Sequence, residues 1–432
     1  MPSFFHSLLA KVARKQLAAC KPHIIAVTGS VGKTSTRTAI AHALSARFRV
    51  RTAQKNYNNE IGVPLAILGE LSPGSNAWEW IKILARNAGK EEMPEYLVLE
   101  YGADKQGDIE YLCTIAKPEV AVITAVSPVH VSNYPSYEAL IEEKASLGDQ
   151  VDEAGLVVLN MDNEHTRGMK SRFRANVVTY GIHHEADIMA KDVAFFTRKD
   201  GDGKFMQGED FARFSATIVA GSERAEIVLT NCISETILSS VLAACAVARF
   251  YEIPLADAVH ALEKQTEPVH GRLNPIPGIR GSLIIDDTYN AAPASVLAAL
   301  DVLTAFTPGE THDRHIAVLG DMAELGTMAE NEHRIIGRRV AEVADLFLAI
   351  GPHMKIAADE AIAAGMNRDC VEWFKDSVEA GRYLDMHVQG GDIVLIKGSQ
   401  SMRMEKAVKD IMANPLHATD ILVRQEPRWK SL

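Results

Sequence analysis

A short apolar strand, a glycine-bearing loop and the start of a helix follow one another within residues 24–40, IIAVTGSVGKTSTRTAI. Glycines at positions 29 and 32 let the backbone approach an anion closely, and the free amides of a helix start favour negative charge. In such a loop Lys33 can neutralise outer phosphates, and the hydroxyl of Thr34 can bind magnesium. Val27 stands where the commoner form of the loop has its first glycine, so this is a variant. We expect nucleotide phosphates to contact Thr28, Gly29, Ser30, Val31, Gly32, Lys33, Thr34 and Ser35.

The first part of the chain alternates short β-branched runs with helical stretches, which predicts a parallel sheet covered by helices. Strands are expected at residues 23–28, 48–52, 96–100, 120–124 and 156–160. Between about residues 187 and 231 polar and apolar residues alternate around glycine turns, as in an antiparallel insertion. Two helices are expected after it, at 235–249 and 255–264.

A second domain is predicted to begin near residue 270, after a break that contains Glu267-Pro268 and His270-Gly271. Its expected strands are 282–286, 315–319, 345–350, 370–374 and 392–396. Helices separate them, which indicates a Rossmann-like α/β domain with ligands at the carboxyl ends of its strands. The predicted organisation is an amphipathic helix at 1–21, a P-loop ATP-binding domain at 22–269 and a C-terminal domain at 270–432.

Charge and cysteine content narrow the classes of function. The formal net charge of -11 argues against a broad nucleic-acid surface, because phosphate backbones need a basic face. The five cysteines lie far apart without zinc spacing, so we expect reduced thiols in a cytoplasmic protein. No apolar run reaches the roughly 18 to 20 residues that a membrane span requires.

The first 21 residues combine apolar residues near helical spacing with positive charge from Lys11, Arg14, Lys15 and Lys21. Lys11 interrupts the apolar run too early for a signal peptide. A basic amphipathic helix can pack on its own domain or lie on a membrane surface. Packing is the commoner arrangement, and peripheral membrane contact through this helix stays open.

Several segments together resemble the Mur ligase family, over about residues 23–410. They are TGSVGKTS at 28–35, NYNNEIGVPL at 56–65, LEYGADKQGDI at 99–109, residues 128–144, HGR at 270–272, IDDTYNAAPAS at 285–295, LGDMAELG at 319–326 and KGSQSM at 397–402. The resemblance implies an ADP-forming amide-bond ligase of cell-wall precursor synthesis that activates a carboxylate as an acyl phosphate. It also implies D-alanyl-D-alanine as the amine and a UDP-muramoyl-tripeptide as the acceptor.

The resemblance further implies a metal and phosphate site. Glu100 and His130 would help to hold Mg²⁺, Lys144 would be carbamylated and so become an oxygen ligand, and Arg272 would reach the phosphates of ATP. Glu100 agrees independently, because it closes a predicted strand and carboxylate oxygens suit a hard cation. From the residues alone, the commoner interpretations are a solvated strand end for Glu100, a loop histidine for His130 and an ordinary charged helix face for Glu142-Glu143-Lys144.

Other matched positions imply contacts with the nucleotide and the two substrates. Asp287 and Asn290 belong to the nucleotide-side segment that also contains Asp286 and Tyr289. Asn58 and Asn59 match a loop that borders the acceptor. The segments associated with the incoming amine supply Asp321, Lys397 and Ser399, together with Glu324 and His333.

The chain departs from the family pattern in several places. Residues 236–240, TILSS, replace an HNxxN pattern beside adenine, and Ala125 and Gln400 stand where asparagine and arginine are common. Only about 22 residues precede the first strand, so we expect the family's N-terminal UDP-sugar-binding domain to be missing. We expect a monomer. Two alternatives stay open: another ligase of the family, such as a folate polyglutamylating enzyme, and a nucleotide-binding interaction protein without ligase activity.

Overall fold

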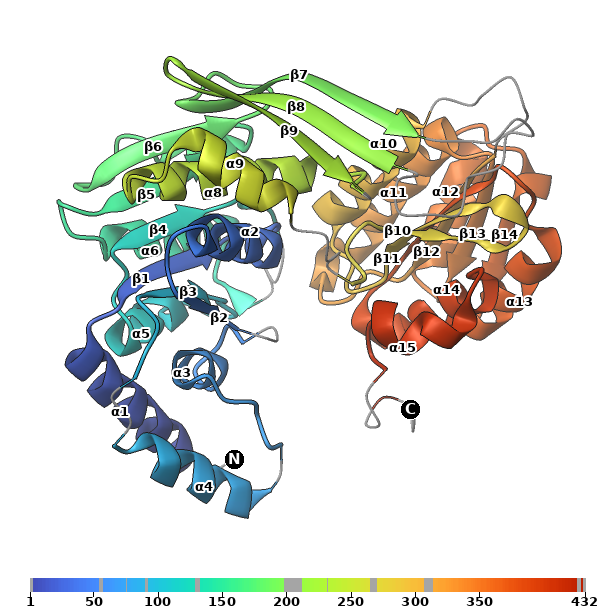
Figure 1. Ribbon diagram of the computed structural model, residues 1–432. Coiled ribbons are helices and arrows are strands. Elements are labelled where there is room, and N and C mark those ends of the chain that lie inside the picture. The colour runs from blue at the N-terminus through green and yellow to red at the C-terminus, as the bar shows by residue number, and fades with distance from the viewer. Residues whose placement is uncertain are drawn as a thin grey trace. The chain divides into compact units, whose positions relative to one another are not determined.

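The computed structural model describes residues 3–53, 57–74, 76–89, 92–128, 133–197, 212–230, 232–264, 270–306, 314–425 and 429. These residues form two compact units (Figure 1). Unit 1 takes the described residues within 1–193, 216–227 and 235–265. Unit 2 takes those within 194–215, 228–234 and 266–432, so parts of one sheet insertion belong to the second unit.

Unit 1 is built on a sheet with the strand order β2-β3-β1-β4-β5-β6-β7-β8-β9. Its first six strands are β1 (His23–Thr28), β2 (Val50–Thr52), β3 (Tyr96–Glu100), β4 (Val120–Ile123), β5 (Leu156–Asn160) and β6 (Asn176–Gly181). Neighbouring strands from β2 to β7 pair in parallel. The chain order reverses at β1, which lies between β3 and β4, and such a switch point is where ligands bind in open α/β sheets. The five strands predicted for this part are confirmed.

Helices cover both faces of this sheet. They are α1 (Ser3–Cys20), α2 (Lys33–Ser45), α3 (Gly62–Leu68), α4 (Ala77–Asn87), α5 (Asp108–Ile115), α6 (Tyr137–Asp149), α7 (Glu164–Gly168), α8 (Glu235–Phe250) and α9 (Leu255–Glu263). On one face α2 contacts α8 and α9, and on the other α3 and α6 pack on the strands, with α1 against α3, α4 and α5. N-terminal capping explains where α4 and α6 begin. The side chain of Asn76 accepts hydrogen bonds from the amides of Trp78 and Glu79 at the start of α4, and that of Ser136 accepts from the amide of Ala139 at the start of α6.

The N-terminal helix α1 packs on its own unit, as the commoner alternative predicted. Its apolar side, Leu9, Ala10, Ala13 and Leu17, is buried in the core shared with α3, α4 and α5. The side chain of Gln16 donates to the carbonyl oxygen of Asn87 at 2.8 Å. Within the described ranges, no helix combines the length and apolar character needed to cross a membrane.

The sheet insertion consists of β7 (Ile188–Thr197), β8 (Ala212–Ala220) and β9 (Glu223–Thr230). Gly221, with φ 63°, lies in the two-residue turn that joins β8 to β9. The parts of the insertion within residues 194–215 and 228–234 belong to unit 2. There the ring centroids of Phe195 and Phe306 lie 5.0 Å apart, and Ile233 is part of the hydrophobic core. Sequence periodicity located these strands but not their division between two units.

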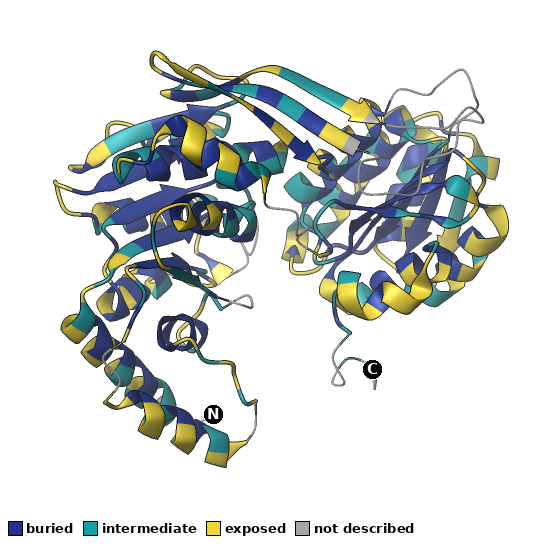
Figure 2. Cartoon of the chain, viewed as in Figure 1, coloured by how far each residue is buried: buried dark blue, intermediate teal, exposed yellow. Residues whose placement is uncertain are grey.

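Unit 2 is a doubly wound sheet with the order β10-β11-β15-β12-β13-β14. Its strands are β10 (Asn274–Pro277), β11 (Leu283–Asp287), β12 (His315–Gly320), β13 (Leu346–Ile350), β14 (Val371–Phe374) and β15 (Ile393–Lys397). Its helices are α10 (Pro293–Ala305), α11 (Ala329–Val343), α12 (Met354–Ala363), α13 (Ser377–His387), α14 (Glu405–Ile411) and α15 (Ala418–Ile421), with 3₁₀ turns η2 (Ile279–Gly281), η3 (Gly326–Met328), η4 (Arg368–Cys370), η5 (Gln400–Met402) and η6 (Pro415–His417). All pairs are parallel except β10 with β11. Alternate strand residues supply two cores, one on each face, and Figure 2 shows the buried strands beneath helices with exposed outer sides.

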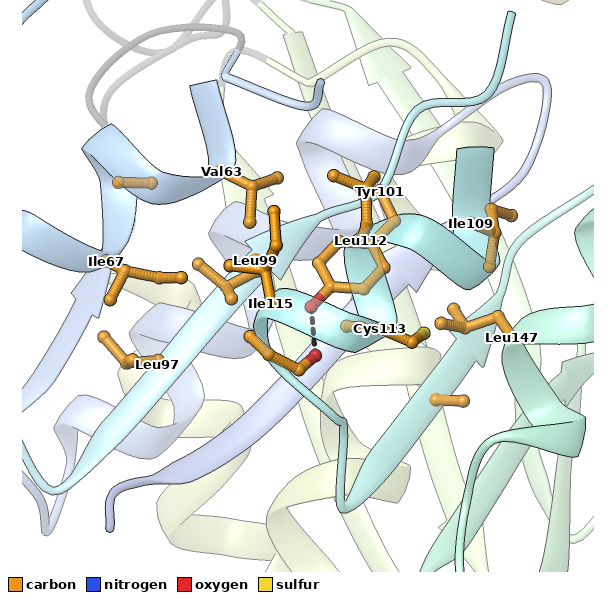
Figure 3. Packing of buried hydrophobic residues seen from close by; sticks show 14 of the residues in the cluster. Val63, Ile67, Leu97, Leu99, Tyr101, Ile109, Leu112, Cys113, Ile115 and Leu147 are labelled. Carbon is orange, nitrogen blue, oxygen red and sulfur yellow. Dashed lines mark hydrogen bonds between the residues drawn. The ribbon is translucent and has the colours of Figure 1, made fainter. Parts of the chain in front are cut away.

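Tyr101 lies at the centre of the unit 1 core, where Leu99, Leu112 and Ile115 surround it (Figure 3). Its ring is fully buried, and its hydroxyl donates to the carbonyl oxygen of Ala116. A buried hydroxyl and carbonyl that satisfy each other avoid the cost of an unpaired polar group. The bond therefore joins the loop after β3 to the end of α5.

We predict that Tyr101→Phe lowers the free energy of unfolding by about 1–2 kcal/mol, because it leaves the Ala116 carbonyl buried without this donor. Urea denaturation measures the change. Tyr111→Phe is the matched control, since Tyr111 is exposed on α5 and its substitution should leave stability within about 0.5 kcal/mol of the parent. Equal effects at both positions would contradict the assigned role of the Tyr101 hydroxyl.

Candidate active site

The glycine-bearing loop between β1 and α2 requires glycine at two positions. Gly29 has φ 142°, and a Cβ there would lie 2.1 Å from the hydroxyl oxygen of Thr124. Gly32 has φ 84°, a left-handed conformation, and directly precedes the first turn of α2. The backbone can therefore follow this tight path only without side chains at these two positions. This conformation leads directly into the N-terminus of α2, which is the local geometry that phosphate loops use.

Residues after β4 hold the loop from one side. The amide of Ser30 donates to the carbonyl oxygen of Ala125 at 2.6 Å, and its hydroxyl donates to that of Ser127 at 2.9 Å. The hydroxyl of Thr124 donates to the carbonyl oxygen of Val31 at 2.6 Å. On the other side, the hydroxyl of Thr28 donates to the carbonyl oxygen of Tyr101 at 2.8 Å. The side chains of Thr28 and Ser30 thus shape the loop, whereas Ser35 lies half-buried in the first turn of α2.

Lys33, the first residue of α2, folds back over the loop. Its ammonium donates to the carbonyl oxygens of Gly29, at 2.8 Å, and of Ser30, at 3.3 Å. The side chain is only half-buried. A cation held in this position can exchange weak carbonyl contacts for charge-assisted bonds to an entering phosphate.

Glu100, at the end of β3, lies beside Thr34. Its carboxylate is 2% exposed and accepts from the Thr34 hydroxyl at 2.9 Å and from the Asn58 side-chain amide at 3.3 Å. The guanidinium of Arg37, itself buried, is 3.7 Å away. The structure therefore brings together three predicted site residues and adds Arg37. Asn59 instead accepts from the amide of Gly62 at 2.9 Å and so stabilises the start of α3.

Lys144 points into unit 1, not toward solvent. It is 4% exposed, and its ammonium donates to the carbonyl oxygen of Ala103 at 3.4 Å. Burial, and secondarily the nearby charge of Lys33, lower the pKa of Lys144 to about 7. Its neighbour Glu143 is buried as well and accepts from the amides of Gly107 and Ile109, both at 2.8 Å. The interpretation as an ordinary solvated helix face, which the residues alone favoured, is therefore wrong for Glu143 and Lys144, whereas Glu142 is exposed.

The oxygens of Thr34 and Glu100 suit a hard cation such as Mg²⁺, which is commonly held by one or two carboxylates together with substrate phosphates. In the described part of the chain, His, Cys, Asp and Glu side chains form no cluster of three that could hold a metal alone. His130, the other predicted ligand, lies outside the described residues. The donor chemistry fits magnesium bound together with a phosphate.

In unit 2 the carboxyl ends of β11 and β15 bring a second set of predicted residues together. Asp287 and Lys397 are register partners, and the Lys397 ammonium lies 2.7 Å from the Asp287 carboxylate. The same ammonium donates to the carbonyl oxygen of Asn290 at 2.7 Å, and the Asn290 side chain is exposed. Burial raises the pKa of Asp287, and the charge of Lys397 opposes that rise. Arg272 lies over the ring of Tyr289, 4.5 Å from its centroid.

The residues expected to meet the amine lie at the same sheet edge. Asp321 accepts from the amide of Met354 at 2.6 Å, at the start of α12. The Ser399 hydroxyl accepts from the amide of Ala323 at 2.7 Å. His333 is fully buried and donates through Nδ1 to the carbonyl oxygen of Ala329 at 2.6 Å, and burial lowers its pKa. These polar groups support the loops around the edge, and Glu324 is exposed beside them.

Two arginines that sequence reasoning missed support these sites. Arg37 accompanies Glu100, and its position one turn after Thr34 on α2 was a usable signal. Arg424 is buried, pairs with Glu405 at 3.0 Å and donates to the carbonyl oxygens of Thr288, at 3.0 Å, and Tyr289. It thereby ties the C-terminal segment to the loop that carries Tyr289. Nothing local in the polar tail indicated a buried guanidinium.

A phosphate loop at the switch point of a parallel sheet, followed by a doubly wound second unit, defines a P-loop nucleotide-binding protein with a second α/β domain. Residues 27–248 match the Mur ligase middle domain, and residues 271–400 match the Mur ligase, glutamate ligase domain. The chain belongs to the Mur ligase family. This confirms the family membership that the sequence segments predicted.

Two relatives of this chain share one name. The UDP-N-acetylmuramoyl-tripeptide--D-alanyl-D-alanine ligase of Synechocystis is 31% identical over 397 residues, which cover 91% of this chain and 75% of the relative. The enzyme of that name from Bacillus subtilis is 27% identical over 409 residues, covering 94% and 80%. The crystal structure of the MurF ligase from Thermotoga maritima in complex with ADP superposes with a TM-score of 0.75 at 25% identity, covering 94% of this chain and 83% of that one.

The lowered pKa of Lys144 predicts a specific pH dependence of stability. The folded protein loses this proton near pH 7, whereas the unfolded chain keeps it until near the ordinary value of 10.5. Between these values the unfolded state binds the extra proton, so stability gains about 1.4 kcal/mol per pH unit from this group as pH rises. Below pH 7 both states are protonated and the contribution is flat.

We therefore expect the stability difference between the parent and Lys144→Met to change with that slope between pH 7.5 and about pH 9.5. Urea denaturation in carbon dioxide-free buffer measures it, since other titrating groups cancel in the difference. Lys105→Met, on an exposed loop of the same unit, is the control and should show no such slope. Parallel curves for the parent and Lys144→Met would refute the buried, depressed ammonium.

Proposed function

We propose that this chain joins D-alanyl-D-alanine to a UDP-muramoyl-tripeptide with ATP as the energy source. The observation that carries the proposal is the constellation around the phosphate loop, in which Lys33, the Thr34–Glu100 pair and Lys144 lie together in a family of ligases. The common name of relatives that cover more than nine tenths of the chain supports the choice of substrates.

The chemistry requires activation, because a carboxylate is a poor electrophile. A carboxylate oxygen of the tripeptide attacks the γ-phosphorus of ATP, ADP leaves, and an acyl phosphate forms. The amine then attacks the acyl carbon, loses a proton, and inorganic phosphate leaves as the tetrahedral intermediate collapses. In this scheme Lys33 binds and neutralises the transferred phosphoryl group, as cations do in phosphoryl transfer. Exclusion of water protects the acyl phosphate from hydrolysis.

Magnesium, when bound, would supply charge stabilisation at the phosphates. Thr34, Glu100 and His130 are its proposed ligands, and a carbamate on Lys144 would add oxygen donors. A carbamate forms from the neutral amine, and the depressed pKa of Lys144 makes that form abundant at neutral pH. The acceptor is assigned to Asn58 and Asn59.

The remaining roles follow the resemblance. Arg272, Asp287 and Asn290 are assigned to the nucleotide. Asp321, Lys397 and Ser399 are assigned to binding of the incoming amine, D-alanyl-D-alanine.

We further propose that the protein is a monomer in the cytoplasm and that it touches membranes peripherally through the basic side of α1.

The direct test incubates purified protein with ATP, Mg²⁺, UDP-muramoyl-tripeptide and D-alanyl-D-alanine. We expect one phosphate released per product, and a product mass equal to the two substrates less one water. Lys33→Ala should lose at least about a hundredfold in turnover, since one preorganised cation at a phosphoryl group contributes that much or more. Phosphate release without either acceptor or dipeptide, or an active Lys33→Ala protein with normal stability, would refute the proposal.

A second prediction concerns magnesium. Glu100→Gln keeps the size of the side chain and a hydrogen-bond acceptor for Thr34 but removes the charge, so half-maximal activity should need roughly ten to a hundred times more Mg²⁺. Magnesium titrations of turnover measure this. Glu110→Gln, exposed on α5, is the matched control and should titrate like the parent. Superimposable titrations for Glu100→Gln would return Glu100 to a purely structural role.

A further inference from the structure

Helix α4 has two apolar sides, of which one is buried in the core and the other is exposed. Trp80 and Ile83 are buried against unit 1, whereas Trp78 is 73% and Ile81 is 48% exposed. Trp78 and Ile81 lie three residues apart, so they share one face of the helix. Leu71, in the segment that leads to α4, is 50% exposed. Large apolar side chains gathered in this way commonly mark an interaction surface.

Helix α1, which contacts α4, carries exposed positive charge. Its apolar side is buried, so Lys11, Arg14 and Lys15 are exposed on its outer side. The Lys15 ammonium donates to the carbonyl oxygen of Ala88 at 3.3 Å, directly after α4, and the two helices are in contact. Figures 1 and 2 show them side by side in unit 1, with exposed residues along their outer sides. We call Lys11, Arg14, Lys15, Leu71, Trp78 and Ile81 the α1–α4 surface.

The positive charge is a regional property of the chain. Helix α1 and the residue after it carry four basic residues, Lys11, Arg14, Lys15 and Lys21, and no aspartate or glutamate, although the whole chain has a formal net charge of -11. Among the described residues, Lys11 and Arg14 enter no ion pair, so their charges are not neutralised locally. On α4, Lys82 pairs with Glu79 at 2.6 Å and adds little net charge. A partner of this surface must therefore offer negative charge beside an apolar layer.

We propose that the α1–α4 surface docks the enzyme on a membrane surface that contains anionic lipids. Trp78, Ile81 and Leu71 would enter the boundary between headgroups and acyl chains, where tryptophan is favoured. Lys11 and Arg14 would lie over the anionic headgroups, whose attraction acts within about one Debye length. A lipid surface meets both requirements without a shaped groove. The contact is peripheral and reversible, because the apolar side of α1 is already used by the core.

This inference rests on the peripheral membrane contact proposed above and not on the proposed ligation, because none of these residues belongs to the nucleotide or amine site. The test uses the full chain and co-sedimentation with two kinds of vesicle, one of phosphatidylcholine and one of an equal mixture of phosphatidylcholine and phosphatidylglycerol. We expect binding to the mixed vesicles only, weakening as salt is raised. Tryptophan fluorescence should shift to shorter wavelength on binding, and Trp78→Phe should lose most of that shift.

Deleting α1 would uncover the core, so point substitutions are sharper. Lys11→Gln with Arg14→Gln should weaken binding about thirtyfold, as expected for the loss of two charges near an anionic surface. Trp78→Ser with Ile81→Ser should weaken it at least about tenfold. The matched controls lie in unit 2: Arg368→Gln with Lys409→Gln, and Met386→Ser with Leu416→Ser, all at exposed positions. Both controls should bind like the parent, and all four variants should keep the parent's ligase activity in solution.

Three outcomes would overturn the proposal. The first is no binding to mixed vesicles at low salt, the second is equal binding to both kinds of vesicle, and the third is unchanged binding by the α1–α4 variants. Self-association of the parent that Trp78→Ser with Ile81→Ser abolishes, without vesicle binding, would instead make this face a contact between copies of the chain. Absence of ligase activity in the parent protein would refute the proposed ligation and leave the vesicle result standing.

Discussion

The candidate active site depends on the parallel register that sets Glu100 beside Val27 in the sheet. Because β3 and β1 end at the same edge, the carboxylate that closes β3 lies next to the phosphate loop that follows β1. A buried carboxylate is costly unless it is hydrogen-bonded or paired, and here Thr34, Asn58 and Arg37 provide those contacts. These partners come from α2 and from the segment before α3. The sheet, the loop and the first helices after it are thus held in one arrangement by a single acid.

Charge is concentrated locally in an acidic chain. Burial disfavours the proton of Lys144, and the nearby charge of Lys33 disfavours it further. Phosphate oxygens would relieve this repulsion, which is the electrostatic condition of an anion site. In unit 2 the buried charge is negative instead, and the carboxylate of Asp287 forms an ion pair with Lys397 on the neighbouring strand. In both units the carboxyl edge of a parallel sheet collects charged residues that are far apart in sequence.

The sequence predicted regular elements well where burial imposes a simple pattern. Strands buried on both faces appear as continuous apolar runs, and β1, β3 and β5 were placed without error. The helices between these strands were predicted only as helical stretches without bounds, and in α4 apolar residues on two sides, such as Trp78 and Trp80, obscure a single periodic face. The short strand β10 was missed, since Pro275 and Pro277 argue against a strand except at a sheet edge, where it lies.

By itself the sequence determined the phosphate loop, because glycine spacing, the preceding strand and the following helix are all local properties. It also identified the family, through segments whose order along the chain is specific. Only the tertiary structure decided the state of Lys144 and the position of Arg424. Each is a charged residue in polar text, and each is buried because distant elements close over it: α6 packs Lys144 against the loop after β3, and the C-terminal segment carries Arg424 to Glu405. Burying a charge is costly unless it has partners, so local sequence predicts that such residues are exposed. The partners that offset this cost come from distant elements, which only the fold brings together.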